Sequence, residues 1–188
     1  MTQREIEVRD ARDTLGRFRV VDVREAHEFE GPLGRIAGAE LLPLGQVAER
    51  AASFAPDQPL LLVCRSGRRS DDACAALRDA GVSEAVNLLG GMIAWNQAGL
   101  PIEDPIPASL QALAEQVLRW TAQVGPQSLE TLRSDCRDLL GAQGSAATAA
   151  SVDTLIERSR AGFADEPPAD FELSIASFRR WLTALEAR

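Results

Sequence analysis

The sequence lacks lysine entirely, and its 188 residues include only one histidine, His27, and three cysteines, Cys64, Cys74 and Cys136. Without lysine, neither Schiff-base chemistry nor a P-loop nucleotide site can operate, because both depend on a lysine side chain. No pair of cysteines has CxxC spacing, so the cysteines and His27 are too few for a zinc site. A small, odd number of cysteines also argues against a disulfide framework and favours reduced thiols.

Long apolar runs and an excess of positive charge are also absent. No window approaches the run of apolar residues that a membrane span needs, and the N-terminus lacks the apolar core of a secretory signal. We therefore expect a cytoplasmic protein that does not enter membranes. The formal net charge of −8 argues against general nucleic-acid binding. We also expect no cofactor and no metal.

The composition changes near residue 104, and this change predicts two domains. Short apolar runs alternate with helical patterns before this point, whereas only helical patterns follow it. Residues 100–107 contain three prolines, which remove backbone donors and disfavour helix, so an extended linker is predicted there. We expect one domain over residues 1–104 and a helical domain of unassigned role over residues 105–188.

The first domain is predicted to be α/β. Four apolar segments are candidate strands: residues 18–23, 39–42, 60–64 and 85–89. Helical patterns lie between them: residues 8–15, 46–54, 69–80 and 92–98. Strands that alternate with helices form a parallel sheet with helices on both faces, and reactive groups gather at its carboxyl edge.

The second domain is predicted to be a small helical bundle. Apolar residues at helical spacing indicate three or four amphipathic helices: residues 106–124, 129–139, 152–156 and 171–185. Cys136 falls on the second of these. Residues 141–150 are rich in glycine, alanine and serine, so they are predicted to be a flexible loop or a weak helix start.

The most informative stretch follows the candidate strand at residues 60–64, and we call it the cysteine loop: Cys64-Arg65-Ser66-Gly67-Arg68-Arg69-Ser70. A loop that wraps into a helix start points backbone N–H groups inward, and the helix dipole adds positive potential there. These effects and the arginines favour a thiolate at Cys64 and form a cradle for an anion. The loop therefore predicts a nucleophile for anionic substrates. The alternative is a buried structural cysteine beside surface arginines.

Several segments together resemble the rhodanese family of sulfurtransferases over about residues 5–103. Val20-Val21-Asp22-Val23-Arg24-Glu25 looks like the family's first strand and turn, and the cysteine loop is similar to its active-site loop. Gly34-Arg35-Ile36-Ala37-Gly38-Ala39 looks like its G-H-I-P-G-A segment, and Gly90-Gly91-Met92-Ile93-Ala94-Trp95 matches its ending. Arg35 and Ala37 depart from the family's usual His and Pro, at positions that are not the nucleophile.

The resemblance implies a thiosulfate-type sulfurtransferase with a rhodanese-like fold. Cys64 would take sulfane sulfur from a small anionic donor such as thiosulfate or from a persulfide donor. It would hold this sulfur as a persulfide and pass it to cyanide or a thiol in a ping-pong reaction. The expected substrate-binding residues are those of the cysteine loop: Arg65, Ser66, Gly67, Arg68, Arg69 and Ser70. A protein partner or a second copy of the chain could dock on the C-terminal helices.

Three residues are expected to support the cysteine loop. Asp22 and Arg24 follow a buried strand, and an ion pair or turn is their expected role because buried charges need partners. Trp95 is expected to pack beneath or beside the pocket.

Three further residues have two interpretations each. Cys74 is either a core thiol or a thiol that resolves a Cys64 persulfide, and Cys136 either packs in the bundle or accepts sulfur. His27 is expected to be a solvated residue on a short polar helix rather than a general base.

Two competing functions remain. A rhodanese-fold phosphatase or arsenate reductase would place arginine six positions after the cysteine, where this sequence has Ser70. A non-catalytic interaction or regulatory module would have its pocket covered by helices. Its cysteine would then resist alkylating reagents.

Overall fold

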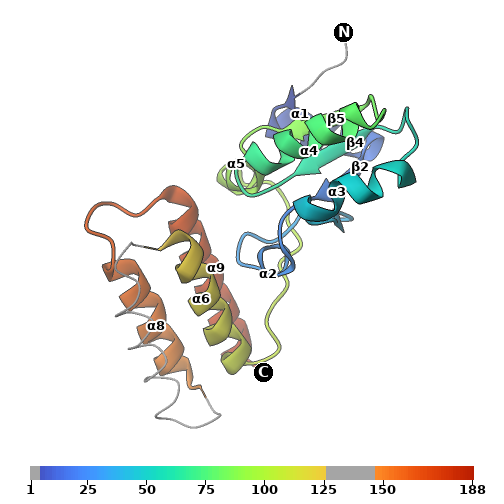
Figure 1. Ribbon diagram of the computed structural model, residues 1–188. Helices are drawn as coiled ribbons and strands as arrows, with labels where there is room; N and C mark the ends of the chain where they lie inside the picture. The colour runs from blue at the N-terminus through green and yellow to red at the C-terminus, as the bar shows by residue number, and fades with distance from the viewer. Residues whose placement is uncertain (1–4, 126–146) are drawn as a thin grey trace. The chain divides into compact units, whose positions relative to one another are not determined.

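The computed structural model describes residues 5–125 and 147–188. The chain divides into two compact units, Met1–Asp104 and Pro105–Arg188, and Figure 1 shows the helices and strands of both. Among the described residues, no helix is both long enough and apolar enough to cross a lipid bilayer.

A parallel sheet of five strands forms the centre of the first unit, in the order β1-β5-β4-β2-β3. The strands are β1 (Glu5–Ile6), β2 (Arg19–Asp22), β3 (Glu40–Leu41), β4 (Leu60–Val63) and β5 (Ala85–Leu88). This sheet confirms the α/β fold class. The sequence does not predict β1, because two residues are too few to show a period.

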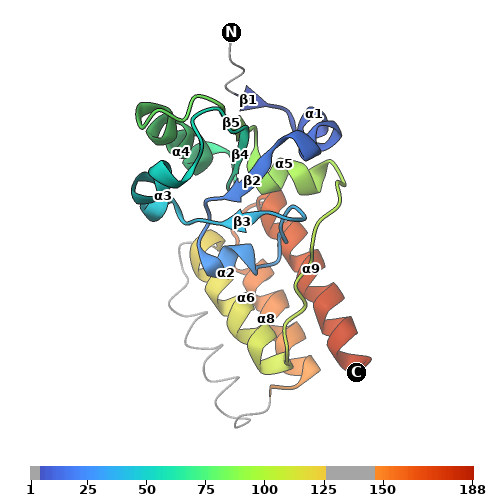
Figure 2. The same ribbon diagram turned by 90° about the vertical axis from the view of Figure 1, so that its right-hand side faces the viewer.

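Helices cover both faces of this sheet. They are α1 (Val8–Asp13), α2 (Ala26–Phe29), α3 (Leu44–Arg50), α4 (Arg68–Asp79) and α5 (Gly91–Gln97). The helices α3 and α4 pack together on one face, and α1 and α5 pack together on the other (Figure 2). The predicted helix at residues 46–54 starts earlier, as α3, and ends in a 3-10 turn at Ala51–Ser53.

The burial of β4 and α4 fixes the position of the cysteine loop. Every residue of β4 is at most 1% exposed, and a strand covered on both faces needs the continuous apolar run that its sequence has. The buried side chains of α4 lie at positions 70, 73, 74 and 77, the spacing of one helix face. The chain is therefore held on both sides of the loop, by the strand before it and by the helix after it.

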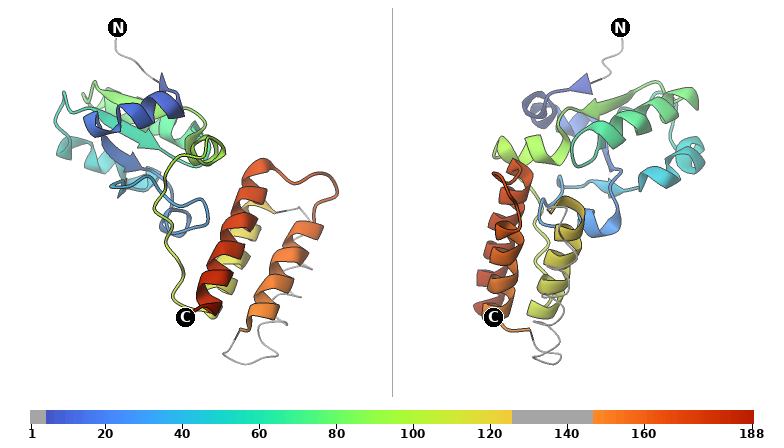
Figure 3. Two further views of the ribbon diagram at one scale, coloured as in Figure 1. Left: turned by 180° about the vertical axis from the view of Figure 1, so that it is seen from behind. Right: turned by 60° about the vertical axis from the view of Figure 1, so that its left-hand side comes forward.

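The second unit is helical, as predicted. Its described helices are α6 (Leu110–Val124), α8 (Ala149–Ala161) and α9 (Ala169–Glu186), and each packs against the other two (Figure 3). Their buried side chains are mostly apolar and include Leu113, Val117, Leu155, Phe171 and Phe178. This apolar contact is what holds the three helices together.

The first helix of this unit begins later than the predicted residue 106, at Leu110. Pro107 disfavours helix at the residue before it, and the Ser109 hydroxyl caps α6 by accepting from the backbone N–H of Ala112 at 3.2 Å. Ile106 consequently stays outside the helix and is 44% exposed. The predicted helix at residues 129–139, with Cys136, and most of the loop predicted at 141–150 lie outside the described residues.

Candidate active site

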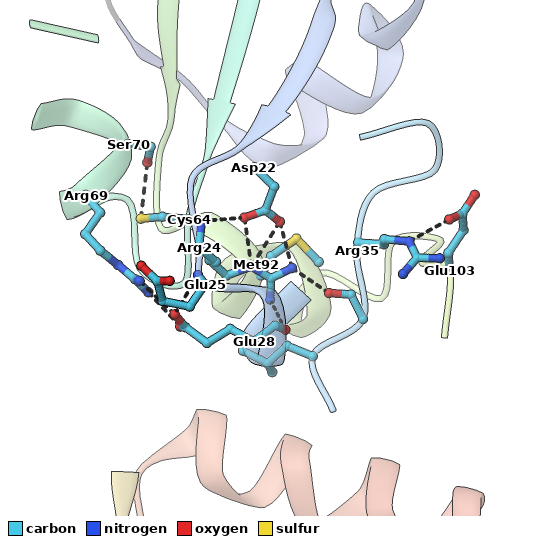
Figure 4. Close-up of polar contacts among 12 residues, drawn as sticks. Asp22, Arg24, Glu25, Glu28, Arg35, Cys64, Arg69, Ser70, Met92 and Glu103 are labelled. Atoms are coloured by element: carbon cyan, nitrogen blue, oxygen red, sulfur yellow. Dashed lines mark hydrogen bonds and ion pairs between the residues drawn. The ribbon is translucent and has the colours of Figure 1, made fainter. Parts of the chain in front are cut away.

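Cys64 directly follows β4 at the carboxyl edge of the sheet and is 1% exposed. Its Sγ atom accepts hydrogen bonds from the backbone N–H of Gly67 at 3.1 Å and from the Ser70 hydroxyl at 3.3 Å. Figure 4 shows the contact with Ser70. Gly67 is the N-cap of α4 and has a φ of +92°, a left-handed value that favours glycine. The start of α4 therefore directs an N–H group at the sulfur and stabilises negative charge on it.

The hydroxyl of Ser70 has one proton and three acceptors within reach. These are the Cys64 Sγ at 3.3 Å, the Gly67 carbonyl at 3.1 Å and the Asn87 Oδ1 at 2.7 Å. The Asn87 side chain also donates, through Nδ2, to the Glu5 carboxylate at 3.5 Å, which keeps Oδ1 turned toward Ser70. A negatively charged sulfur would be the strongest acceptor of the three, so the hydroxyl is placed to turn to Cys64 if that sulfur carries charge.

The start of α5 supports the cysteine loop from the other side. The backbone N–H of Met92 donates to the Cys64 carbonyl at 2.9 Å, and that of Ile93 donates to the Arg65 carbonyl at 3.0 Å. Gly91 makes this close approach possible, because a Cβ atom there would lie 2.3 Å from the Cys64 carbonyl oxygen. Its φ of +54° is also in the left-handed region.

Replacing Gly91 by alanine is therefore expected to lower the free energy of unfolding by about 2–4 kcal/mol, because the new Cβ must displace the loop backbone. Urea-induced unfolding measures this loss. Gly99→Ala is the matched control, because Gly99 has a φ of +66° but open space where its Cβ would lie. That variant should lose only about 1 kcal/mol, from the left-handed backbone alone. Equal losses in both variants would contradict this description of the loop.

Arg69 is paired with a buried carboxylate. Its NH1 atom donates to Glu28 Oε2 at 2.7 Å and its NH2 atom to Glu28 Oε1 at 2.6 Å. Burial would raise the pKa of Glu28, but the hydrogen bonds from Arg69 and from the Glu25 backbone outweigh it and hold that pKa below its usual value. The hydrogen bonds that Arg69 makes to Glu28 raise the pKa of Arg69. Both groups are therefore charged at neutral pH and neutralise each other.

Asp22 and Arg24 form a fully buried ion pair at the end of β2. The Arg24 Nε and NH2 atoms donate to the two Asp22 carboxylate oxygens at 2.7–2.9 Å. The guanidinium also donates to the backbone carbonyls of Glu28 at 3.1 Å and Gly34 at 2.8 Å. Arg24 thus holds α2 in place, and α2 carries the carboxylate that meets Arg69. This route connects the end of β2 to the cysteine loop (Figure 4).

The other loop residues differ in exposure. Ser66 and Arg68 are exposed, and Arg68 makes no side-chain hydrogen bond or ion pair with the residues that the structure describes. Arg65 is half-buried, and burial lowers the pKa of its guanidinium. The structure thus brings Gly67 and Ser70 to the sulfur, ties Arg69 to Glu28 and leaves Arg68 facing solvent.

Trp95 and Arg35 both contact the chain that follows α5. Trp95 is buried in α5, and its Nε1 donates to the carbonyl of Pro101 at 2.9 Å. It therefore secures the chain that follows α5. Arg35 pairs with Glu103 at 2.8 Å and lies over the ring of Phe29. The arginine that stands where the family usually has histidine is therefore paired with a residue near the end of the first unit.

Sequence reasoning assigns no role to Glu28 or Asn87. Glu28 has a local signal, the reciprocal capping box with Glu25, but its contact with Arg69 spans 41 positions. Asn87 is a buried polar residue inside the otherwise apolar β5, and such a residue needs a hydrogen-bond partner. A polar residue within an apolar strand is thus the sequence signal that could have identified Asn87.

His27, expected to be solvated, is half-buried on α2.

Cys74 lies in the core between α4 and the sheet and has no exposed surface. Burial raises the pKa of its thiol from 9.0 to about 12. A buried, protonated thiol is a poor nucleophile, which favours the interpretation of Cys74 as a packing residue. Among the described residues, no group of three His, Cys, Asp or Glu side chains could hold a metal ion.

Cys74 should resist iodoacetamide at about pH 8 in the folded protein and react after unfolding. Because the folded pKa lies above the unfolded one, the unfolded state loses its proton first as the pH rises. The contribution of Cys74 to stability is thus fully present below pH 9.0 and is lost as the pH rises toward 12. Cys74→Ala should flatten the fall in unfolding free energy across that range. Rapid labelling of Cys74 in the folded protein, found by peptide mapping, would contradict the interpretation of Cys74 as a buried, protonated thiol.

Comparisons with known proteins agree with this fold. The family model described as a rhodanese-like domain matches residues 7–98. A sulfurtransferase of Allochromatium vinosum is 38% identical over 96 residues, which cover 51% of this chain and 84% of that protein. The uncharacterized protein YqhL of Bacillus subtilis is 42% identical over 76 residues, which cover 40% of this chain and 59% of that protein.

A solved structure shows the same fold. The solution NMR structure of the rhodanese-like domain from the Anabaena protein Alr3790 has a TM-score of 0.50 and 24% sequence identity, and the match covers 55% of this chain and 80% of that chain. The predicted resemblance is thus confirmed by both sequence and fold. The chain belongs to the rhodanese family and carries its domain in residues 7–98.

Proposed function

We propose that the protein is a sulfurtransferase that carries sulfane sulfur as a persulfide on Cys64. The observation that supports this most is the environment of the sulfur atom, which accepts from the Gly67 N–H and the Ser70 hydroxyl at the start of α4. Hydrogen-bond donors around a sulfur stabilise its anionic forms, and both the thiolate and the persulfide are anions. Relatives that bear the name sulfurtransferase support the same class of activity.

The proposed reaction has two steps. The Cys64 thiolate attacks the outer sulfur of thiosulfate, a new S–S bond forms, the S–S bond of the donor breaks, and sulfite leaves with the electron pair. Cyanide or a thiolate then attacks the terminal sulfur of the persulfide, and Cys64 leaves as the thiolate. The N–H of Gly67 and the hydroxyl of Ser70 hold the anionic sulfur between the two steps. No cofactor takes part, and the cytoplasm would keep the thiol reduced.

A non-catalytic interaction module is the second candidate, and the 1% exposure of Cys64 is the observation that favours it. The phosphatase alternative has less support. The arginine nearest the expected position, Arg69, is held by Glu28, whose carboxylate would repel a phosphate.

Steady-state kinetics separate these functions. We expect thiocyanate to form from thiosulfate and cyanide, with the parallel double-reciprocal lines of a ping-pong reaction. A sealed module would form no thiocyanate, and its Cys64 would not react with iodoacetamide until the protein unfolds. A phosphatase would hydrolyse p-nitrophenyl phosphate and form no thiocyanate.

A further inference from the structure

The Glu28 carboxylate contacts Arg69, an arginine of the cysteine loop. Its side chain is 5% exposed, and both of its oxygens accept from Arg69. The second oxygen, Oε2, also accepts from the backbone N–H of Glu25 at 3.2 Å. Glu28 is therefore fixed in place by its helix as well as by the arginine.

We propose that Glu28 is a specificity-determining residue that makes the site prefer monoanionic sulfur donors to dianionic thiosulfate. It acts through Arg69, so it is a positioning residue rather than one that touches the donor. Organic persulfides and thiosulfonates are the class of monoanionic donor that this charge balance favours. The inference rests on the proposed sulfurtransferase function of Cys64.

Arg69 would have to give up its contacts with Glu28 in order to turn toward a donor. Its two hydrogen bonds to Glu28 would break, and a nearly buried carboxylate would be left without its partner. The charge of Arg69 is therefore largely withheld from a bound anion. The exposed Arg68 remains as a cation of the loop. A second negative charge on the donor thus gains little and is repelled by Glu28.

Both donor classes give the same intermediate. With thiosulfate, the Cys64 thiolate takes the outer sulfur and sulfite leaves as a dianion. With benzenethiosulfonate, the thiolate takes the terminal sulfur and benzenesulfinate leaves as a monoanion. Each step breaks one S–S bond and forms one, and the persulfide that remains is identical. Differences between the donors therefore report on their binding and first step.

The test compares kcat/KM for thiosulfate and for benzenethiosulfonate, with cyanide as acceptor, in the wild type and in Glu28→Gln. Glu28→Gln removes the charge that neutralises Arg69. It should therefore raise kcat/KM by roughly fivefold for each negative charge on the donor, at the electrostatic screening typical of a protein surface. The ratio of the two kcat/KM values should therefore shift toward thiosulfate by about fivefold, mainly through KM. Added salt should reduce the shift.

Glu40→Gln is the matched control. Glu40 also forms a two-contact pair with an arginine, Arg19, but at the amino end of β2, away from the cysteine loop. Glu40→Gln should leave the ratio of the kcat/KM values for the two donors unchanged. The double variant Glu28→Gln/Arg69→Gln removes both charges of the pair. It should return the ratio to the wild-type value if net charge is the cause.

Three results would overturn the inference. The ratio could stay unchanged in Glu28→Gln, both donors could lose kcat/KM equally, or the double variant could keep the shifted ratio. If Glu28→Gln does not fold, as thermal unfolding would show, the test compares Arg69→Gln with the double variant, because these two differ only in the charge of Glu28. The ratio should shift away from thiosulfate in Arg69→Gln and return to the wild-type value in the double variant. Equal ratios in these two variants would overturn the inference. Failure of the proposed function looks different, because wild-type Cys64 would then take sulfur from neither donor.

Discussion

Cys64→Ser is expected to abolish the formation of thiocyanate from thiosulfate and cyanide, with a loss of at least about 10³-fold. The proposed reaction needs a thiolate that attacks a sulfane sulfur and then leaves it, and a hydroxyl is a weak nucleophile at its ordinary pKa. The substitution changes one atom at a buried position, so the fold should remain. Steady-state assays, with circular dichroism to verify folding, measure the effect.

Cys74→Ala is the matched control for this loss. Cys74 is as deeply buried as Cys64, but burial holds the pKa of its thiol near 12, and it faces the core between α4 and the sheet. Its replacement should leave thiocyanate formation within about twofold of the wild type. Cys64→Ser that keeps its activity, or Cys74→Ala that loses it while folded, would mean that the sulfur is carried elsewhere.

Arg24→Met is expected to destabilise the protein by about 3–5 kcal/mol, the largest stability effect that the structure predicts. Both partners of the Asp22–Arg24 pair are completely buried, so the variant leaves a carboxylate without its counter-charge in the interior. The backbone carbonyls of Glu28 and Gly34 lose their donor as well. Urea-induced unfolding at neutral pH measures the change.

An exposed pair of the same chemistry provides the comparison. Arg19 also makes two hydrogen bonds to one carboxylate, that of Glu40, but their side chains are 33% and 55% exposed. Arg19 also lies over the ring of Phe54, and Arg19→Met should cost about 1 kcal/mol in total. Similar losses in the two variants would show that burial is not what makes the Asp22–Arg24 pair important.

The sequence predicts the framework of the site because the relevant signals are local. The apolar run of β4, the glycine at position 67 and the apolar spacing of α4 place Cys64 at a strand-to-helix turn at the carboxyl edge of the sheet. The ion pair between Asp22 and Arg24 follows from the same kind of reasoning, since two charges after a buried strand need partners.

The sequence does not predict the contacts between distant segments. Arg69 is one of three arginines in the cysteine loop, and nothing near it in the chain indicates that Glu28 of α2 holds it. Asn87 reaches Ser70 because β5 lies beside β4 and below α4, which depends on the strand order of the whole sheet. The need for glycine at position 91 likewise becomes visible only when α5 meets the Cys64 carbonyl.

The most direct test of the central claim is the mass of the intact protein after incubation with thiosulfate. We expect the reduced wild-type protein to gain one sulfur atom and to lose it again when cyanide is added, with an equal amount of thiocyanate released. Peptide mapping should place the added sulfur on Cys64, and Cys64→Ser should gain none. A wild-type protein that gains no sulfur from thiosulfate or benzenethiosulfonate, or that carries it on another residue, would contradict the proposal.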